Sequence, residues 1–267
     1  MERSAKPALS ALAGLLLAAA APLQAEPVPV RYTEGLVHGF LVLRNTEGQI
    51  IADGDLIQVP RGDQVSSRLS FRFRDGSFWE DAVVFSQRRQ FRLLSEHLVQ
   101  RGPSFPRTLE SSLDTRRGTV SVRYTDDDGK EKSADERLDL PADLANGLMS
   151  VLLKNVRPEA PPVLSMLAMT PKPRLVKVKI QAAADDPFSH GESQRKATHY
   201  VLAVEIGGLP GLIAPLVGKQ PPESHVWILQ GDAPAFLKSD TQLYVGGPTW
   251  QIELASPSWP SNKPAAR

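Results

Sequence analysis

The chain of 267 residues contains no cysteine. It therefore cannot form a disulfide, use a thiolate as a nucleophile, bind zinc or an iron–sulfur cluster through sulfur, or carry a lipid on a cysteine. An excess of charge of one sign is also missing, because 31 basic and 30 acidic residues nearly cancel. A nucleic-acid-binding protein needs a clustered basic excess, so nucleic acid is not expected as a partner.

Long apolar runs are scarce, and the one clear case lies at the N-terminus. Arg3 and Lys6 precede a Leu/Ala-rich stretch over residues 8–21, and a small residue follows at a suitable cleavage point. This layout is typical of a secretory signal peptide. The run is shorter than a membrane span and Pro22 interrupts it. We expect residues 1–25 to be cleaved, which leaves a periplasmic or secreted chain without a lipid anchor or a transmembrane span.

Most of the remaining sequence alternates apolar and polar residues with the period of two that is typical of β-strands. In residues 68–85, Leu69, Phe71 and Phe73 alternate with polar residues, and Asp75-Gly76 supplies a tight turn. One apolar and one charged face indicate an antiparallel sheet with one solvated side. Further strands are expected at 40–59, 118–140, 174–182, 199–206, 225–231, 242–247 and 250–255.

Two stretches leave their local structure open. Residues 90–102 fit either a strand or a helix, and Asp53-Gly54 fits a bulge or a turn inside the pattern of residues 40–59. By contrast, Glu47-Gly48 is expected to join two strands, and residues 125–132 to form a solvated hairpin tip.

One segment, residues 140–155, has helical spacing, carried by Leu144, Leu148, Val151 and Leu152. The proline-rich residues 157–164 cannot continue that helix, and they would connect the halves of a two-part domain. A sheet with ten or more antiparallel strands must curl, close or split. We therefore predict a mainly β chain: a large curled antiparallel sheet or half-barrel with one central helix. The β-rich domain would span residues 26–256, with a flexible tail at 257–267.

Motifs for common catalytic chemistry are missing. A phosphate-binding loop has four residues between its first glycine and Gly-Lys, whereas six separate Gly211 from Gly218, and Lys219 is followed by glutamine. There is no Gly-x-Ser-x-Gly motif, and no two of the five histidines have the spacing of a helical zinc motif. We therefore predict no catalytic residue, metal or cofactor. The alternative that stays open is a metal site assembled from distant strands, because His199 and His225 flank the loop 207–222.

The aromatic residues, 6% of the chain, include three tryptophans in predicted strands. In a curled sheet they would either line an apolar cavity or form the core, because large aromatics serve both purposes. The candidate ligand-binding residues are Trp79, His199, Tyr200, Lys219, Trp227 and Trp250.

Four features together resemble uncharacterised bacterial periplasmic proteins of unknown function. They are Ala-Thr-His-Tyr at 197–200, Gly-Gly-Leu-Pro-Gly at 207–211, Gly-Lys-Gln-Pro-Pro at 218–222, and Trp227. The resemblance implies no catalytic residue. The strand-rich layout with an apolar helix is also similar to that of periplasmic lipoprotein carriers, in which a half-barrel holds acyl chains under a helical lid.

We therefore expect a non-enzymatic protein that binds an apolar or amphipathic molecule, such as a lipid, in the curled sheet. Lys219, in the loop 207–222, would meet an anionic head group at the cavity mouth. A second hypothesis is an envelope scaffold that binds another protein through exposed strand edges. A third is a hydrolase with a site assembled across strands.

Overall fold

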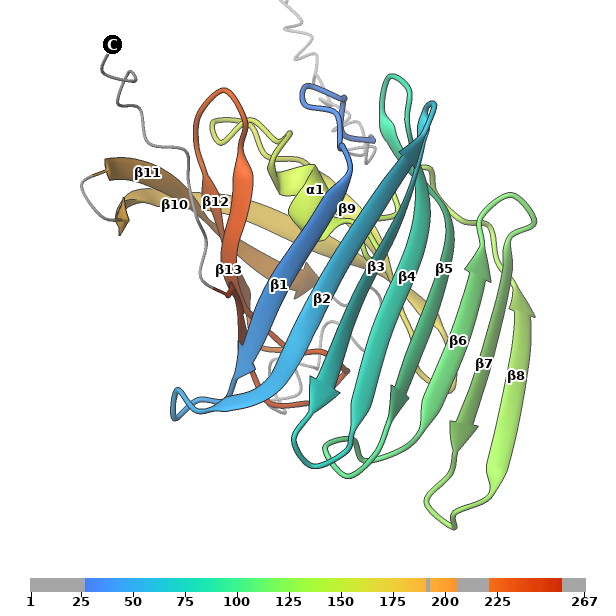
Figure 1. Ribbon diagram of the computed structural model, residues 1–267. Helices are drawn as coiled ribbons and strands as arrows, with labels where there is room; N and C mark the ends of the chain where they lie inside the picture. Colours follow the sequence, from blue (N-terminus) through green and yellow to red (C-terminus); the bar gives the residue numbers. More distant parts are fainter. Residues whose placement is uncertain (1–26, 191–192, 206–220, 256–267) are drawn as a thin grey trace, which may run out of the picture.

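A single antiparallel sheet of 14 strands makes up most of the molecule, as Figure 1 shows. The computed structural model describes residues 27–190, 193–205 and 221–255. The sheet order is β8-β7-β6-β5-β4-β3-β2-β1-β14-β13-β12-β11-β10-β9. Two meanders, β1–β8 and β9–β14, are thus joined where β14 pairs with β1. The predicted large antiparallel sheet is confirmed.

The strands of the first meander are Val37–Arg44 (β1), Ile50–Arg61 (β2), Gln64–Phe73 (β3), Phe78–Gln87 (β4), Phe91–Arg101 (β5), Leu109–Asp114 (β6), Thr119–Thr125 (β7) and Glu131–Arg137 (β8). Those of the second are Val163–Ala168 (β9), Arg174–His190 (β10), Ser193–Glu205 (β11), Ser224–Leu229 (β12), Ala235–Thr241 (β13) and Trp250–Leu254 (β14). The short helix α1 spans Met149–Leu153. None of the helices in these described residues is long and apolar enough to cross a membrane.

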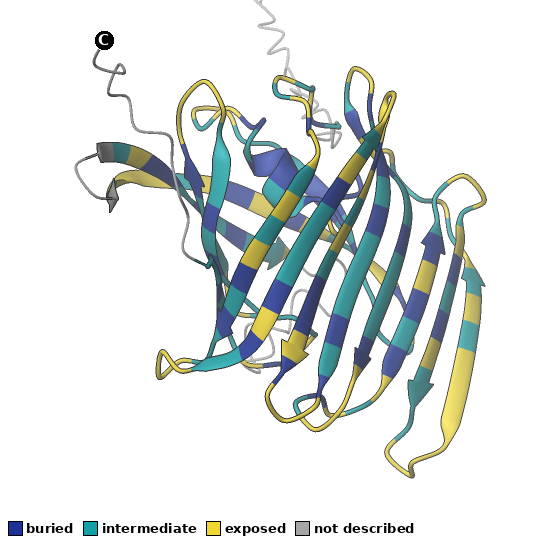
Figure 2. Ribbon diagram, viewed as in Figure 1, coloured by how far each residue is buried: buried dark blue, intermediate teal, exposed yellow. Residues whose placement is uncertain are grey.

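The sheet curls around the segment that connects β8 to β9, and this segment includes α1 (Figure 1). Buried side chains of β3–β7, of the connecting segment and of β9–β12 form one continuous cluster, in which Phe85, Leu148, Leu164 and Ile228 are fully buried. The alternation of buried and exposed residues along the strands follows from the period of two (Figure 2). The inner face of the curl is therefore a packed core.

The turns expected from sequence are confirmed where glycine adopts a positive φ. Gly48, Gly76 and Gly129 have φ values of 79°, 87° and 77° in the three predicted hairpins. Residues 90–102, which fitted strand or helix, form β5. Asp53-Gly54 makes neither a bulge nor a turn, because it lies inside β2. Gly54 is needed there for space: a Cβ atom would lie 2.5 Å from Cε1 of Phe71.

The helix is shorter than the expected residues 140–155. Gly147 has a φ of 62°, and its Cα lies so close to β4 that a Cβ atom would meet Cγ1 of Val83 at 2.3 Å. The preceding residues pair with β9, since Leu144 forms a parallel bridge with Ser165. Residues used for this pairing cannot also be helical, so α1 begins only at Met149.

The two outer strands of the sheet are protected in different ways. β8 has five charged residues among its seven, a composition that opposes pairing with another chain. β9 is covered by the connecting segment: the amide of Ala145 donates to the carbonyl of Ser165 at 2.8 Å. Oδ1 of Asn146 accepts from the Leu167 amide at 2.8 Å, and its Nδ2 donates to the Leu167 carbonyl at 2.9 Å. The side-chain amide of Asn146 thus pairs with the edge of β9 as a peptide group of a further strand would.

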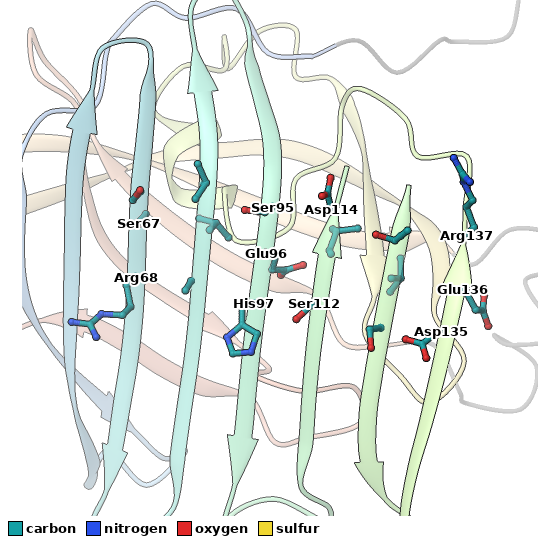
Figure 3. A pocket seen from close by; sticks show the side chains of 18 of the residues that line it. Ser67, Arg68, Ser95, Glu96, His97, Ser112, Asp114, Asp135, Glu136 and Arg137 are labelled. Carbon is teal, nitrogen blue, oxygen red and sulfur yellow. The ribbon is translucent and has the colours of Figure 1, made fainter. Parts of the chain in front are cut away.

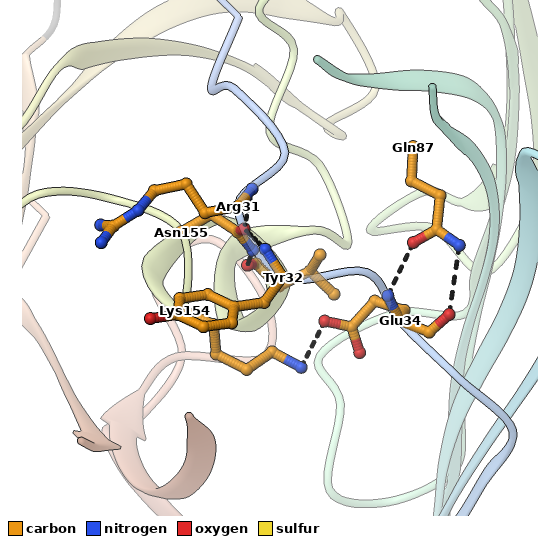
Figure 4. A network of polar contacts seen from close by, with 7 residues as sticks. Arg31, Tyr32, Glu34, Gln87, Lys154 and Asn155 are labelled. Atoms are coloured by element: carbon orange, nitrogen blue, oxygen red, sulfur yellow. Dashed lines mark hydrogen bonds and ion pairs between the residues drawn. The ribbon is translucent and has the colours of Figure 1, made fainter. Parts of the chain in front are cut away.

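A polar network ties the segment before β1 to the end of α1 (Figure 4). Oδ1 of Asn155 accepts hydrogen bonds from the amides of Arg31 and Tyr32 at 2.8 and 2.7 Å. The Lys154 ammonium lies 2.5 Å from the buried carboxylate of Glu34. These contacts hold the part of the connecting segment that directly follows α1.

Replacing Asn146 by alanine should lower the free energy of unfolding by about 2–3 kcal/mol, because two hydrogen bonds are lost and two main-chain groups of β9 are left buried and unpaired. Urea unfolding followed by circular dichroism measures this change. The control is Gln49→Ala, which removes an exposed hydrogen bond to Asn45 and should change stability by less than about 0.5 kcal/mol. Equal effects of the two substitutions would contradict the assigned role of Asn146.

Candidate functional site

A trough of about 990 Å³ crosses strands β2–β8 on the face turned away from α1 (Figure 3). Two rows of directly opposed residues form its floor. The first row is Ile57, Arg68, Ala82, His97, Ser112, Ser121 and Asp135. The second row is Val59, Ser66, Val84, Ser95, Asp114, Thr119 and Arg137. Because side chains alternate between the faces of a strand, both rows project from the same face.

The trough is hollow because many side chains along its floor are short. The short side chains of the two rows are Ser66, Ala82, Ser95, Ser112, Thr119 and Ser121. The neighbouring row on the same face carries longer side chains, with Glu80 opposite Val99, then Glu110 and Arg123. This neighbouring row forms a wall beside the trough.

The chemistry of the floor changes from one end to the other. Strands β2 and β4 contribute apolar side chains, those of Ile57, Val59, Ala82 and Val84. Strand β3, between them, contributes Ser66 and Arg68, so this end also carries one positive charge. Strands β5–β8 contribute hydroxyl groups and charges of both signs, including Asp135 and Arg137. An extended molecule in the trough would therefore contact mainly apolar side chains at one end and a hydrogen-bonding surface at the other.

Glu110 links the wall to the floor of the trough. Its carboxylate lies 3.1 Å from Nε2 of His97 and 3.2 Å from Nη2 of Arg123. The hydrogen bond with His97 and the charge of Arg123 lower the pKa of Glu110, so this carboxylate is ionised at neutral pH. Asp114, at the end of β6, instead accepts hydrogen bonds from the main-chain amides of Arg116 and Arg117 and so stabilises a turn.

The five candidate residues from sequence that the structure describes do not line this trough. Trp79, Tyr200 and Trp250 are buried, with 5%, 1% and 6% of their surfaces exposed. Trp79 and Trp250 belong to an aromatic cluster in which Phe73 lies 5.5 Å from Trp250 between ring centroids. These three side chains occupy packed core. His199 and Trp227 lie together on β11 and β12, and Lys219 lies outside the described residues.

Sequence reasoning missed the trough because its short side chains are far apart in the chain. Each serine or alanine alone is typical of a solvated strand position. Only the register of seven strands places Ala82, Ser112 and Ser121 in one line. The available signal was the lack of long side chains at these outward positions.

Two acidic residues lie on the opposite, inner face of the same strands. Glu96 of β5 is 4% exposed, and Asp81 of β4 has a buried Oδ1 atom. Within the described residues, neither Asp81 Oδ1 nor Glu96 Oε2 has a hydrogen-bond partner. Burial, followed by the charge of Glu80, raises the pKa of Asp81 to about 7. Burial and the charge of Asp81 also raise the pKa of Glu96 well above its usual range.

This carboxyl pair contacts the segment that covers β9. Nδ2 of Asn146 lies 3.5 Å from Oε1 of Glu96, and a Cβ atom on Gly147 would lie 2.9 Å from Oδ2 of Asp81. Ionisation of the pair would place negative charge in the core, beside the residues that hold the curl together.

Comparisons with known proteins give little further information. No family model matches the chain, and no curated protein was found to match it. A solved β-barrel-like protein of the domain of unknown function DUF1849, from Brucella abortus, is similar, with 9% sequence identity and a TM-score of 0.45. The match covers 84% of this chain and 98% of that one.

The buried carboxyl pair predicts that stability falls as the pH rises. The folded chain keeps protons on Asp81 and Glu96 that the unfolded chain releases above about pH 4. The free energy of unfolding should therefore decrease as the pH rises above about 4, and the contribution of Asp81 to this decrease should end near pH 7. In the double variant Asp81→Asn/Glu96→Gln this decrease should be much smaller, and at pH 8 the variant should be more stable by on the order of 2 kcal/mol.

Urea unfolding at pH 5, 6, 7 and 8 tests this expectation. Glu110→Gln is the matched control, because that carboxylate is exposed to solvent and its pKa is lowered instead of raised. A pH dependence that is the same in the double variant and in the unmodified chain would show that the pair does not hold protons in the folded state.

Proposed function

We propose that the chain is an exported, non-enzymatic protein that binds an extended amphipathic molecule in the trough across β2–β8. The observation that carries this proposal is the alignment of short side chains in two rows across seven strands, which hollows one face of the sheet. The sequence of residues 1–25 supports export to the periplasm or beyond.

The dimensions of the trough suit an elongated ligand. Six spacings of about 4.8 Å separate the seven strands, so the trough crosses about 29 Å of sheet. Its volume of about 990 Å³ is at the upper end of the range for small-molecule sites. A lipid with one or two acyl chains matches a site that is long and partly apolar.

The two ends of the trough suggest how such a ligand would lie. Its apolar part would contact Ile57, Val59 and Val84 on β2 and β4. Its polar head would lie over β5–β8, where serine and threonine hydroxyls both donate and accept hydrogen bonds. Asp135 and Arg137 bring opposite charges to that end, which favours a zwitterionic or hydroxyl-rich head over one with a single net charge.

This proposal keeps the ligand class that the sequence suggested but moves the site to the other face of the sheet. The inner face is filled by core side chains and by the segment around α1. The scaffold hypothesis has less support, because β8 is strongly charged and β9 is covered.

A second candidate function is hydrolysis of an ester in the same trough. Ser112 lies directly opposite His97 in the β5–β6 register, and His97 contacts the Glu110 carboxylate. Serine, histidine and a carboxylate in this order are the components of a nucleophilic triad. Within the described residues, however, no hydrogen bond joins Ser112 to His97, so binding without catalysis is the better-supported function.

Filling the trough should weaken the binding of an amphipathic ligand. Ser112→Trp places a large ring on the floor, and it should weaken binding of a dansyl-labelled C12 fatty acid at least tenfold, as measured by fluorescence titration. The matched control is Ser133→Trp, on the same face of the sheet but outside the trough. The control should bind like the unmodified chain.

Native mass spectrometry with lipid extraction, on chain purified from a periplasm, identifies the natural ligand and the cleavage point. A lipid adduct that is lost in Ser112→Trp and kept in Ser133→Trp supports the proposal. Equal probe binding in all three proteins would refute the position of the site. An ester turnover lost in His97→Ala would favour the second candidate.

A further inference from the structure

Two histidines meet on the outer face of the second meander. His199 of β11 and His225 of β12 alternate with core residues such as Tyr200 and Val226, so their side chains point away from the main core. The same face carries a small buried cluster that includes Ala197 and Leu229. Nε2 of His199 lies 2.9 Å from Nδ1 of His225. The ring centroids are 5.1 Å apart, and the ring planes are inclined by 35°.

The His199 ring is held in place by a stacked tryptophan. Trp227 lies opposite His199 in the register, with ring centroids 4.4 Å apart and planes inclined by only 6°. The Trp227 indole is itself held by side chains from β10 and β13: its Nε1 donates to Oδ2 of Asp186 at 2.7 Å, and Nζ of Lys238 lies 4.1 Å from its ring centroid. The imidazole is therefore positioned before any ligand arrives.

The surroundings of His199 favour its neutral form. Burial, followed by the charge of His225, lowers the pKa of His199, and the charge of Lys238 acts in the same direction. Asp186 and Asp240 act in the opposite direction and supply nearby negative charge. A neutral imidazole nitrogen with a free lone pair is the form that binds transition metals.

We infer that His199 and His225 together bind one divalent transition-metal ion, which takes the place of the proton that they share. Metal–nitrogen distances are about 2.0–2.1 Å, so two nitrogens bound to one metal at a right angle are about 2.9 Å apart. This is the separation observed between Nε2 and Nδ1. To bind one metal, the side chains must rotate, because the two nitrogens face each other in the hydrogen bond.

The site differs from a closed structural metal centre. Within the described residues, no group of three or more histidine, aspartate or glutamate side chains could surround a metal. Two protein ligands leave the remaining coordination positions to solvent. Imidazole ligands suit copper, nickel and zinc, and among these divalent ions copper binds most tightly to a given set of ligands. A metal at this position departs from the expectation of no metal, and it is independent of the proposed function because neither histidine lines the trough.

Copper binding to the metal-free chain tests the inference in two independent ways. Calorimetric titration with CuCl₂ at pH 7.5 should give one site per chain. Copper also quenches the fluorescence of a nearby indole, so the fluorescence of Trp227 should fall over the same copper concentrations at which the heat of binding is released. His199→Gln and His225→Asn, which keep polar side chains of similar length, should each weaken binding at least tenfold. Trp227→Phe should remove most of the quenching while the heat of binding remains.

The control is His38→Ala, since His38 is an exposed histidine on β1 that contacts Asp55. It should bind copper like the unmodified chain. At pH 5.5 binding should weaken, because protons compete for the imidazoles. Circular dichroism confirms that each variant is folded. Unchanged affinity in His199→Gln and His225→Asn, or loss of the site in His38→Ala, would show that copper binds elsewhere and overturn the inference.

Discussion

The hydrogen bonds between Asn146 and the main chain of Leu167 are the contacts on which the rest of the structure depends. They attach the connecting segment to β9, at one outer edge of the sheet. The same segment packs through Gly147 against Val83 on the first meander. A sheet of this width cannot stay flat, and an open curl must bury its inner face against something. Here a short, mostly irregular stretch of chain does so, and it joins both ends of the sheet.

Filling the inner face has a direct effect on where a ligand can bind. Trp79 and Trp250 are used in the core, and the trough lies on the outside of the curl. There the two meanders differ. The first presents short side chains in register and hence a hollow, whereas the second presents His199, His225 and Trp227, which stack on one another. One sheet thus carries two unlike surfaces on the same face.

Most of the strands and the turns could be predicted from sequence because they depend on neighbours along the chain. Residues 242–247, expected as a strand, instead connect β13 to β14, and β13 itself was not expected. Asp75-Gly76 forms its turn whatever the rest of the molecule does. The end of the helix and the sites depend on partners distant in sequence. Gly147 breaks the helix partly because Val83 lies against it, and Ala82 lines a trough only because Ser112 and Ser121 are in register with it. No local pattern contains that register.

The pairing of β1 with β14 has a consequence for how the chain acquires its structure. Leu41 lies opposite Leu254, so the middle of the sheet is a seam between the first strand and the last. Contacts between residues this far apart form late and slowly, because the intervening chain must first be ordered. Until residues 250–254 are available, β1 has an unpaired edge. The native sheet therefore cannot be completed before residues 250–254 have been synthesised.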